Sequence, residues 1–330
     1  MKTKILQILR QNQEYVSGQE LCELLGVSRT TVWKAINQLK EAGYEIEAVS
    51  NRGYRMLSIP DILSQSEIES VQQTKWAGHP IYYYAELDST NTQAKRQGEE
   101  GAAHGAVIVA NTQTAGRGRR GRTWNSPKDS GLFYTMLLKP QIMPSNAPML
   151  TLVQAMAAAK GIRKISGLEA LIKWPNDIVI NGKKVAGILT EMSAQIDYVN
   201  YIVVGTGINV HQLDFPKEIV KTASSIDLSS KENGTEIHVS RAELLNAILE
   251  EFEVYYEKYI QTQDLSAIAE EYNQLLVNKG RQVRVLDPIG EFEGQALGIN
   301  PQGELLVKHQ EKIVKISSGE VSVRGIYGYV

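Results

Sequence analysis

The chain has 330 residues, which is long enough for two or three domains that each bury their own core. A hydrophobic content of 42% and a charged content of 22% are ordinary for a globular protein, and a net charge of -2 says little about partners. The single Cys22 excludes an intrachain disulfide and no apolar run reaches the roughly 20 residues of a membrane span, so we expect a cytoplasmic protein without membrane contact.

The first 60 residues predict a small helical domain that ends in a hairpin. Apolar residues recur at helical spacing in three stretches, namely Ile5, Leu6, Ile8 and Leu9, then Leu21, Leu24 and Leu25, then Val32, Ile36 and Leu39. Ser28 is a good N-cap for the third helix, and little more than Gly26 and Val27 separates it from the second. Strand-like patterns over 44–48 and 54–56 follow. This order is that of a winged helix-turn-helix.

The third helix and the wing carry side chains that can reach the phosphates and base edges of DNA. The candidate DNA-binding residues are Arg29, Thr30, Thr31, Lys34, Asn37 and Arg52. The alternative is a solvated helix in a protein–protein module. We favour DNA binding, because the basic residues fall on the recognition helix and the wing together.

A linker near 58–61 opens a central segment that we place at 61–278. Its predicted strands are 81–86, 106–112, 131–138, 170–174, 177–180, 184–193 and 199–208, and its predicted helices are 91–98, 147–165, 241–260 and 264–277. Asn181-Gly182 is the preferred pair for a type I′ hairpin turn. Strands outnumber helices and several are joined by tight hairpins, so we expect an α+β mixed sheet rather than a doubly wound parallel one.

The last segment, 279–330, consists of short strands with turn signals between them. The predicted strands are 281–286, 291–299, 304–308, 312–317 and 321–324. They fit a small five-stranded β-barrel.

An arginine loop lies at 116–122, where four arginines alternate with three glycines and no acidic residue occurs from 101 through 128. Such a segment suits a ligand with several negative charges, such as a nucleotide triphosphate. It also fits a solubilising loop or a second nucleic-acid contact. The glycines match G-x-G-x-x-G, but no helix follows them, so we reject a dinucleotide site.

Two later strings surround the Asn181-Gly182 turn. In 173–177, a proline between two strands either aims Asn176 or Asp177 out of the sheet or makes a simple turn. Lys183 and Lys184 begin the next strand and must point to opposite faces. The sequence does not say which of them points inward.

Other strings are open to two interpretations. The glycines at 205 and 207 end a buried run and allow either the close approach of a flat ligand or only a bulge. Ser89 precedes a short helix and is either a site residue or an N-cap. The five histidines show no ligand spacing, so we expect no structural metal site.

Taken together, the strings at 89–91, 116–122, 173–177, 184–189 and 205–209 resemble those of biotin protein ligases. With a winged helix in front, the chain is similar to the bifunctional members that also repress biotin genes. The resemblance covers the whole chain and is specific because the strings occur in this order. It implies a ligase domain like that of class II synthetases and a C-terminal barrel of the SH3-like kind.

The resemblance implies two chemical steps. Biotin and ATP, with Mg²⁺ bound to the nucleotide, give biotinyl-5′-AMP and pyrophosphate. A lysine of a biotin carboxyl carrier domain, of the acetyl-CoA carboxylase or pyruvate carboxylase type, then takes the biotinyl group. The adenylate-bound enzyme is further expected to form a homodimer that binds operator DNA, with biotinyl-AMP as corepressor.

The resemblance also implies the site residues. The biotin-binding ones are Ser89, Thr90, Asn91, Gln113, Gly116, Arg117, Gly118, Arg119, Lys184 and Gly187. The ATP-binding ones are Arg120, Arg122, Trp124, Asn176 and Asn209. The catalytic ones are Lys184, Arg119 and Arg117.

Two other functions are weighed against this one. A non-catalytic biotin-sensing transcription factor would share the winged helix but would not exchange pyrophosphate into ATP. A lipoate–protein ligase is a relative by fold. The winged domain and the arginine loop argue against the lipoate enzyme.

Overall fold

The computed structural model describes residues 1–12, 14–286, 290–318, 322–325 and 329–330. The chain divides into two compact units. The first is Met1–Gln73 with Val239–Asn246, and the second is Thr74–His238 with Ala247–Val330. The first unit therefore extends beyond residue 60, while the domain limits 1–60, 61–278 and 279–330 stay predictions.

The first unit contains the expected helix-turn-helix and wing. Its elements are α1 (Lys2–Gln11), α2 (Gly18–Leu25), α3 (Arg29–Glu41), β1 (Glu45–Val49), β2 (Gly53–Ser58), α4 (Gln65–Val71) and the start of α8 (Arg241–Thr262). The hydroxyls of Ser17 and Ser28 cap α2 and α3, and Gly26 ends α2 in the left-handed conformation with φ 65°. Leu6, Leu9, Leu21, Val32 and Ile36 are among the residues of its core.

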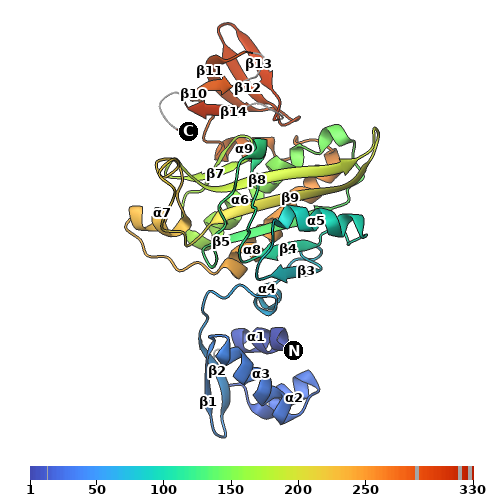
Figure 1. Ribbon diagram of the computed structural model, residues 1–330, viewed down its shortest axis with the longest axis vertical. Coiled ribbons are helices and arrows are strands. Elements are labelled where there is room, and N and C mark those ends of the chain that lie inside the picture. Colours follow the sequence, from blue (N-terminus) through green and yellow to red (C-terminus); the bar gives the residue numbers. More distant parts are fainter. Residues whose placement is uncertain (13, 287–289, 319–321, 326–328) are drawn as a thin grey trace. The chain divides into compact units, whose positions relative to one another are not determined.

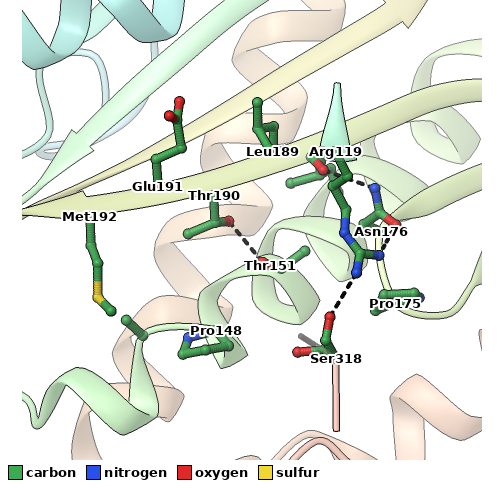
Figure 2. A pocket seen from close by; sticks show the side chains of 12 residues that line it. Arg119, Pro148, Thr151, Pro175, Asn176, Leu189, Thr190, Glu191, Met192 and Ser318 are labelled. Atoms are coloured by element: carbon green, nitrogen blue, oxygen red, sulfur yellow. Dashed lines mark hydrogen bonds between the residues drawn. The ribbon is translucent and has the colours of Figure 1, made fainter. Parts of the chain in front are cut away.

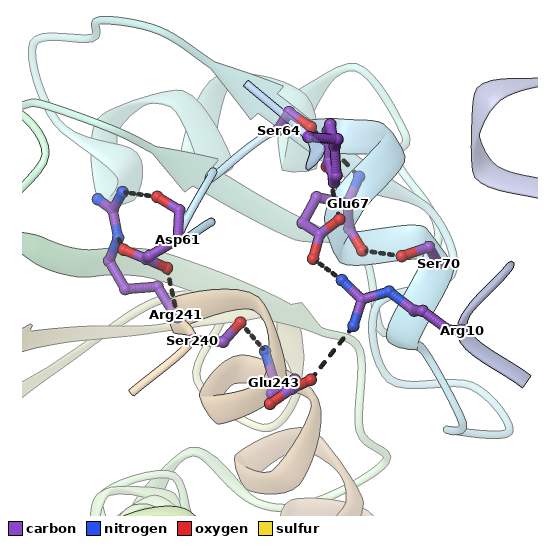
Figure 3. Close-up of polar contacts among 9 residues, drawn as sticks. Arg10, Asp61, Ser64, Glu67, Ser70, Ser240, Arg241 and Glu243 are labelled. Carbon is purple, nitrogen blue, oxygen red and sulfur yellow. Dashed lines mark hydrogen bonds and ion pairs between the residues drawn. The ribbon is translucent and has the colours of Figure 1, made fainter. Parts of the chain in front are cut away.

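A buried ion cluster joins several elements of this unit (Figure 3). The Glu67 side chain on α4 is 1% exposed, forms an ion pair with Arg10 of α1 and accepts a hydrogen bond of 2.6 Å from the Tyr44 hydroxyl. Arg10 also reaches Glu243 in the first turn of α8, at 3.2 Å. Burial, followed by the hydrogen bond to Glu67, raises the pKa of Tyr44, so its phenol stays a donor. The cluster therefore ties α1 and α4 to the start of α8.

The second unit is built on a seven-stranded mixed sheet with strand order β3-β4-β5-β9-β8-β7-β6 (Figure 1). The strands are β3 (Ile81–Tyr84), β4 (Val107–Ala110), β5 (Gly131–Leu138), β6 (Leu171–Lys173), β7 (Asp177–Ile180), β8 (Lys183–Ala194) and β9 (Val199–Asn209). Only β3 and β4 pair in parallel, and the other pairs of the sheet are antiparallel. The fold is α+β, as predicted.

Helices cover both faces of this sheet. The helical elements are α5 (Thr90–Glu99), η1 (Arg119–Gly121), η2 (Pro144–Asn146), α6 (Met149–Ser166), α7 (Ile226–Glu232), the rest of α8 and α9 (Ala269–Leu275). In β5, Tyr134 bonds to Gln154 of α6, while the next residue, Thr135, contacts Thr90 of α5. Successive strand residues point to opposite faces, so α5 and α6 pack on opposite sides. This explains why all eight residues of β5 are buried.

The β7–β8 hairpin forms as predicted. Asn181 and Gly182 both have positive φ, 51° and 75°, as a type I′ turn requires. The short helices α4 and α7 were not predicted, and α9 is shorter than the predicted helix 264–277.

The C-terminal part of the second unit is a small all-antiparallel β domain with strand order β13-β12-β11-β10-β14. Its strands are β10 (Gln282–Leu286), β11 (Phe292–Ile299), β12 (Leu305–His309), β13 (Lys312–Ile316) and β14 (Ser322–Gly325). Residue 321 of the predicted strand 321–324 lies outside the described residues. Among the described helices, none combines the length and apolarity needed to cross a membrane.

Candidate active site and DNA surface

The first part of the site is a buried polar cluster at the start of α5. The backbone N–H and the hydroxyl of Thr90 both donate to Gln113 Oε1, at 2.8 and 3.2 Å. The amide nitrogen of Gln113 donates in turn to Ser126. Ser89 is 3% exposed and its side chain makes no cap hydrogen bond to the helix. The N-cap interpretation of Ser89 is therefore not supported by its hydrogen bonding.

Asn91 belongs to the same cluster and depends on Gly205. A Cβ atom on Gly205 would lie 1.9 Å from Asn91 Oδ1, so only glycine leaves room for this amide. Asn91 Nδ2 donates to Leu189 O and to Glu191, at 3.2 and 2.8 Å. Glu191, which was not predicted, also pairs with Lys95 at 2.8 Å. Burial acts to raise the pKa of Glu191, but Lys95 and Asn91 outweigh it and the pKa is lowered.

The arginine loop returns to the sheet at Trp124, whose indole lies against two facing glycines. Gly187 of β8 and Gly207 of β9 are register partners, and Cβ atoms there would approach the indole to 3.0 and 2.4 Å. The β8–β9 register shifts only at Ser193/Ala194, so the bulge interpretation of the 205–207 glycines is wrong. The indole Nε1 is buried and has no hydrogen-bond partner in the described part of the chain. It is a donor available to a ligand.

The β7–β8 hairpin brings the second part of the site together. Lys184 Nζ forms an ion pair of 2.6 Å with Asp177 and lies 5.3 Å from the Trp124 ring centroid. Lys183 pairs instead with Glu232 of α7, at 2.6 Å. The structure thus answers the question that the sequence left open, since Lys184 is the lysine that points into the site.

Asp177 lies among cations. Burial acts to raise its pKa, but Lys184 and then Lys173 outweigh it, so the pKa is lowered and the group is a carboxylate. Lys173 is 5% exposed, and burial lowers its pKa to about 8. Near neutral pH the hairpin therefore presents one buried anion and two ammonium groups.

Arg119 is the arginine of the loop that enters this region (Figure 2). Its guanidinium donates to Asn176 Oδ1 at 2.9 Å and to Ser318 O at 2.8 Å. Asn176 donates to Ile188 O of β8 at 3.0 Å, so its amide is held beside the strand. Arg119 and Asn176 line a cavity of about 200 Å³ that does not include Thr90 or Gln113. The other three arginines, Arg117, Arg120 and Arg122, are exposed.

Asn209 lies at the end of β9 and is buried. Its amide donates to Ser224 O at 3.0 Å, and Ser224 N donates to Lys184 O at 2.9 Å. One loop therefore links Asn209 to the strand of Lys184. In the described part of the chain, no group of three His, Cys, Asp or Glu side chains gathers as a metal site would require.

The predicted DNA surface lies on α3 and the wing. Arg29, Thr30 and Lys34 are exposed and Asn37 is half-buried, while the Thr31 hydroxyl is 2.9 Å from the Ser28 hydroxyl. On the wing, Arg52 is exposed with its guanidinium 4.3 Å from the Tyr15 ring centroid. The basic groups are thus available on one helix and one wing of the same unit.

Comparisons with known proteins were made for the whole chain. The model of the biotin/lipoate A/B protein ligase family matches residues 83–209, a helix-turn-helix domain model matches 2–55, and a biotin protein ligase C-terminal domain model matches 280–324. The bifunctional ligase/repressor BirA of Bacillus subtilis is 40% identical over 94% of this chain and 94% of its own length. The biotin–[acetyl-CoA-carboxylase] ligase of Paracoccus denitrificans is 42% identical over 38% of this chain and 52% of its own.

Among solved structures, a biotin protein ligase from Aquifex aeolicus in complex with biotin and ATP aligns with a TM-score of 0.63. It is 29% identical, and the alignment covers 74% of this chain and 98% of that one.

Proposed function

Since the chain belongs to the family of bifunctional biotin protein ligases and repressors, we propose that its two site clusters divide one adenylation reaction between them. The enzyme is an ATP-dependent biotin–protein ligase with a helix-turn-helix DNA-binding domain. The observation that carries the division of roles is the placement of Lys184 and Arg119 on either side of the 173–177 bend, next to the Thr90–Gln113 cluster's own loop.

The Thr90 cluster binds the ureido ring of biotin. Ser89, Thr90, Asn91 and Gln113 offer the mixed donors and acceptors that a urea group needs, and the backbone of 116–118 closes over the ring. Gly187 leaves room for the tail. Burying its four methylenes contributes about 0.8 kcal/mol each, roughly 3 kcal/mol in all.

The cationic groups act where two anions meet. The biotin carboxylate attacks the α-phosphorus of ATP, the bond to pyrophosphate breaks, and biotinyl-5′-AMP forms. Lys184, Arg119 and Arg117 offset the repulsion between carboxylate and phosphate, and they do so best when already in position. Lys184 supplies a compact charge, while arginine supplies forked donors.

The nucleotide occupies the neighbouring surface as its magnesium complex. Arg120 and Arg122, exposed on the arginine loop, contact its phosphates, and Trp124 stacks near the adenine with its Nε1 donor available. Asn176 and Asn209 contact the nucleotide or its metal.

The second half-reaction modifies a carrier domain. A deprotonated lysine amine of a biotin carboxyl carrier domain attacks the acyl carbon, an amide bond forms and AMP leaves. The name of the Paracoccus relative supports a carrier of the acetyl-CoA carboxylase type, and we extend the proposal to the pyruvate carboxylase type. The single cysteine supports the cytoplasm as the compartment.

The full reaction is tested by incubating the chain with biotin, MgATP and a carrier domain, followed by mass measurement. We expect the carrier to gain one biotinyl group on a single lysine, because the adenylate is an activated acyl donor. Omission of ATP should leave the carrier unchanged. A carrier that stays unmodified in the complete mixture would contradict the proposed function.

The winged domain binds operator DNA, and adenylate-bound enzyme does so as a homodimer. This requires that the adenylate stabilise the dimer-competent state more than the other state. One intermediate then serves both the ligation and the control of biotin genes.

Replacing Arg29 and Lys34 together with alanine is expected to weaken operator binding by about tenfold or more, because two phosphate or base contacts are lost. The slope of binding against salt should fall by about one for each phosphate contact. Fluorescence anisotropy with labelled operator DNA measures both effects. Ligation should be unchanged, and Lys4→Ala, an exposed lysine on α1, is the control. Undiminished operator binding would mean that α3 is not the recognition helix.

A further inference from the structure

Tyr329 reaches into the active site from beyond β14. Its hydroxyl donates a hydrogen bond of 2.5 Å to Oδ2 of Asp177, whose other oxygen, Oδ1, pairs with Lys184 at 2.6 Å. One carboxylate is thus held from two sides, by the phenol and by the ammonium group. Tyr329 lies outside the segment 280–324 that matches the C-terminal family model.

The ring of Tyr329 makes a second contact in the same place. The Lys173 ammonium lies 3.7 Å from the ring centroid, which is a cation–π distance. Lys173 and Lys184 both compete for Asp177, since both are buried cations near it. A ring that occupies Lys173 leaves the carboxylate free to pair with Lys184.

Tyr329 keeps its proton. Burial, and then the charge of Asp177, raises the pKa of the phenol, so it acts as a hydrogen-bond donor throughout the neutral range. A charge-assisted bond of this kind is worth about 1.5–3 kcal/mol. That energy is large enough to fix the rotamer of one aspartate.

We propose that Tyr329 is a positioning residue for adenylate formation, acting through Asp177 to hold the Lys184 ammonium where the biotin carboxylate meets the α-phosphate. The inference rests on the proposed role of Lys184. The C-terminal β domain takes part in the same way at a second point, because Ser318 O accepts from Arg119. Two cations of the site are therefore oriented by groups from the C-terminal part of the chain.

The test is Tyr329→Phe in the full chain, which removes the hydroxyl and keeps the ring over Lys173. We expect the single-turnover rate of biotinyl-adenylate formation to fall about tenfold, as the loss of one charge-assisted hydrogen bond predicts. The affinity for biotin and the melting temperature should stay unchanged. Tyr198→Phe is the matched control, since Tyr198 is 54% exposed and lies between β8 and β9.

A double-variant cycle separates positioning from a general structural role. In an Asp177→Asn background, Tyr329→Phe should have no further effect on the rate, because the two residues act as one unit. An unchanged rate in Tyr329→Phe, an equal further loss in the Asp177→Asn background, or a fall in melting temperature that accounts for the loss would each overturn the inference. If the unaltered chain forms no biotinyl-adenylate, the proposed function falls with it. If the unaltered chain is active and Tyr329→Phe equals it, only the inference falls.

Discussion

Lys184→Ala is expected to lower the rate of biotinyl-adenylate formation by about 10²- to 10³-fold, the usual loss when one preorganised donor to a developing charge is removed. Lys184 is the compact cation of the site, fixed 2.6 Å from Asp177 and close to the Trp124 ring. Its removal leaves the repulsion between carboxylate and phosphate less compensated. It also leaves Asp177 with one cation fewer. Biotin-dependent exchange of pyrophosphate into ATP measures the effect.

The neighbouring residue provides the control for this prediction. Lys183 makes a partly exposed ion pair with Glu232, and such pairs contribute about 0.2–1 kcal/mol. Lys183→Ala should therefore exchange pyrophosphate at nearly the normal rate, although the two lysines are adjacent in sequence. Full exchange by Lys184→Ala would remove it from the catalytic residues, and a large loss in Lys183→Ala would mean that the hairpin faces were assigned wrongly.

Local patterns predicted most of the fold. Ser28 marked the start of α3, Asn181-Gly182 marked the β7–β8 turn, and the strand 131–138 was predicted with its observed bounds. Each of these signals lies within a few residues of what it determines. The short helices α4 and α7 gave too few apolar repeats to be recognised.

The site could be predicted only in part, because its decisive contacts join distant residues. Nothing near Lys184 in the sequence shows which lysine faces inward, since that depends on α7 taking up Lys183. The two glycines of 205–207 serve different neighbours, Asn91 and Trp124, which lie far away along the chain. Tyr329 is 152 residues from Asp177 and carries no local signal at all.

The resemblance to a family supplied the roles that geometry alone could not. It named Lys184 and the arginine loop together, but it did not distinguish among the four arginines. The structure separates them, because Arg119 is bonded to Asn176 and Ser318 while the other three are exposed. An ordered Arg119 is ready before substrates bind, whereas exposed arginines must lose side-chain entropy when they engage phosphates.

Glu67→Gln is expected to destabilise the first compact unit by about 3–5 kcal/mol, the usual cost of breaking a buried ion pair by removing one partner. The Glu67 side chain is 1% exposed and that of Arg10 is 12% exposed, so the guanidinium would lose its buried counter-ion. Glutamine still accepts from the Tyr44 hydroxyl, which confines the change to the charge. Hydrogen exchange of α1 and α3 in the full chain measures the loss.

Two comparisons make this prediction specific. Glu69→Gln, on the same helix, removes a carboxylate that only accepts hydrogen bonds from Thr3 and Gln65, so exchange should change little. Adding Arg10→Met to Glu67→Gln should restore most of the protection, because the unpaired charge is then gone. Operator binding should follow the same order among the variants, while adenylate formation should not, since Lys184 and Arg119 belong to the other unit. Equal protection in Glu67→Gln and the unaltered chain would show that the ion pair contributes no net stability to the winged domain.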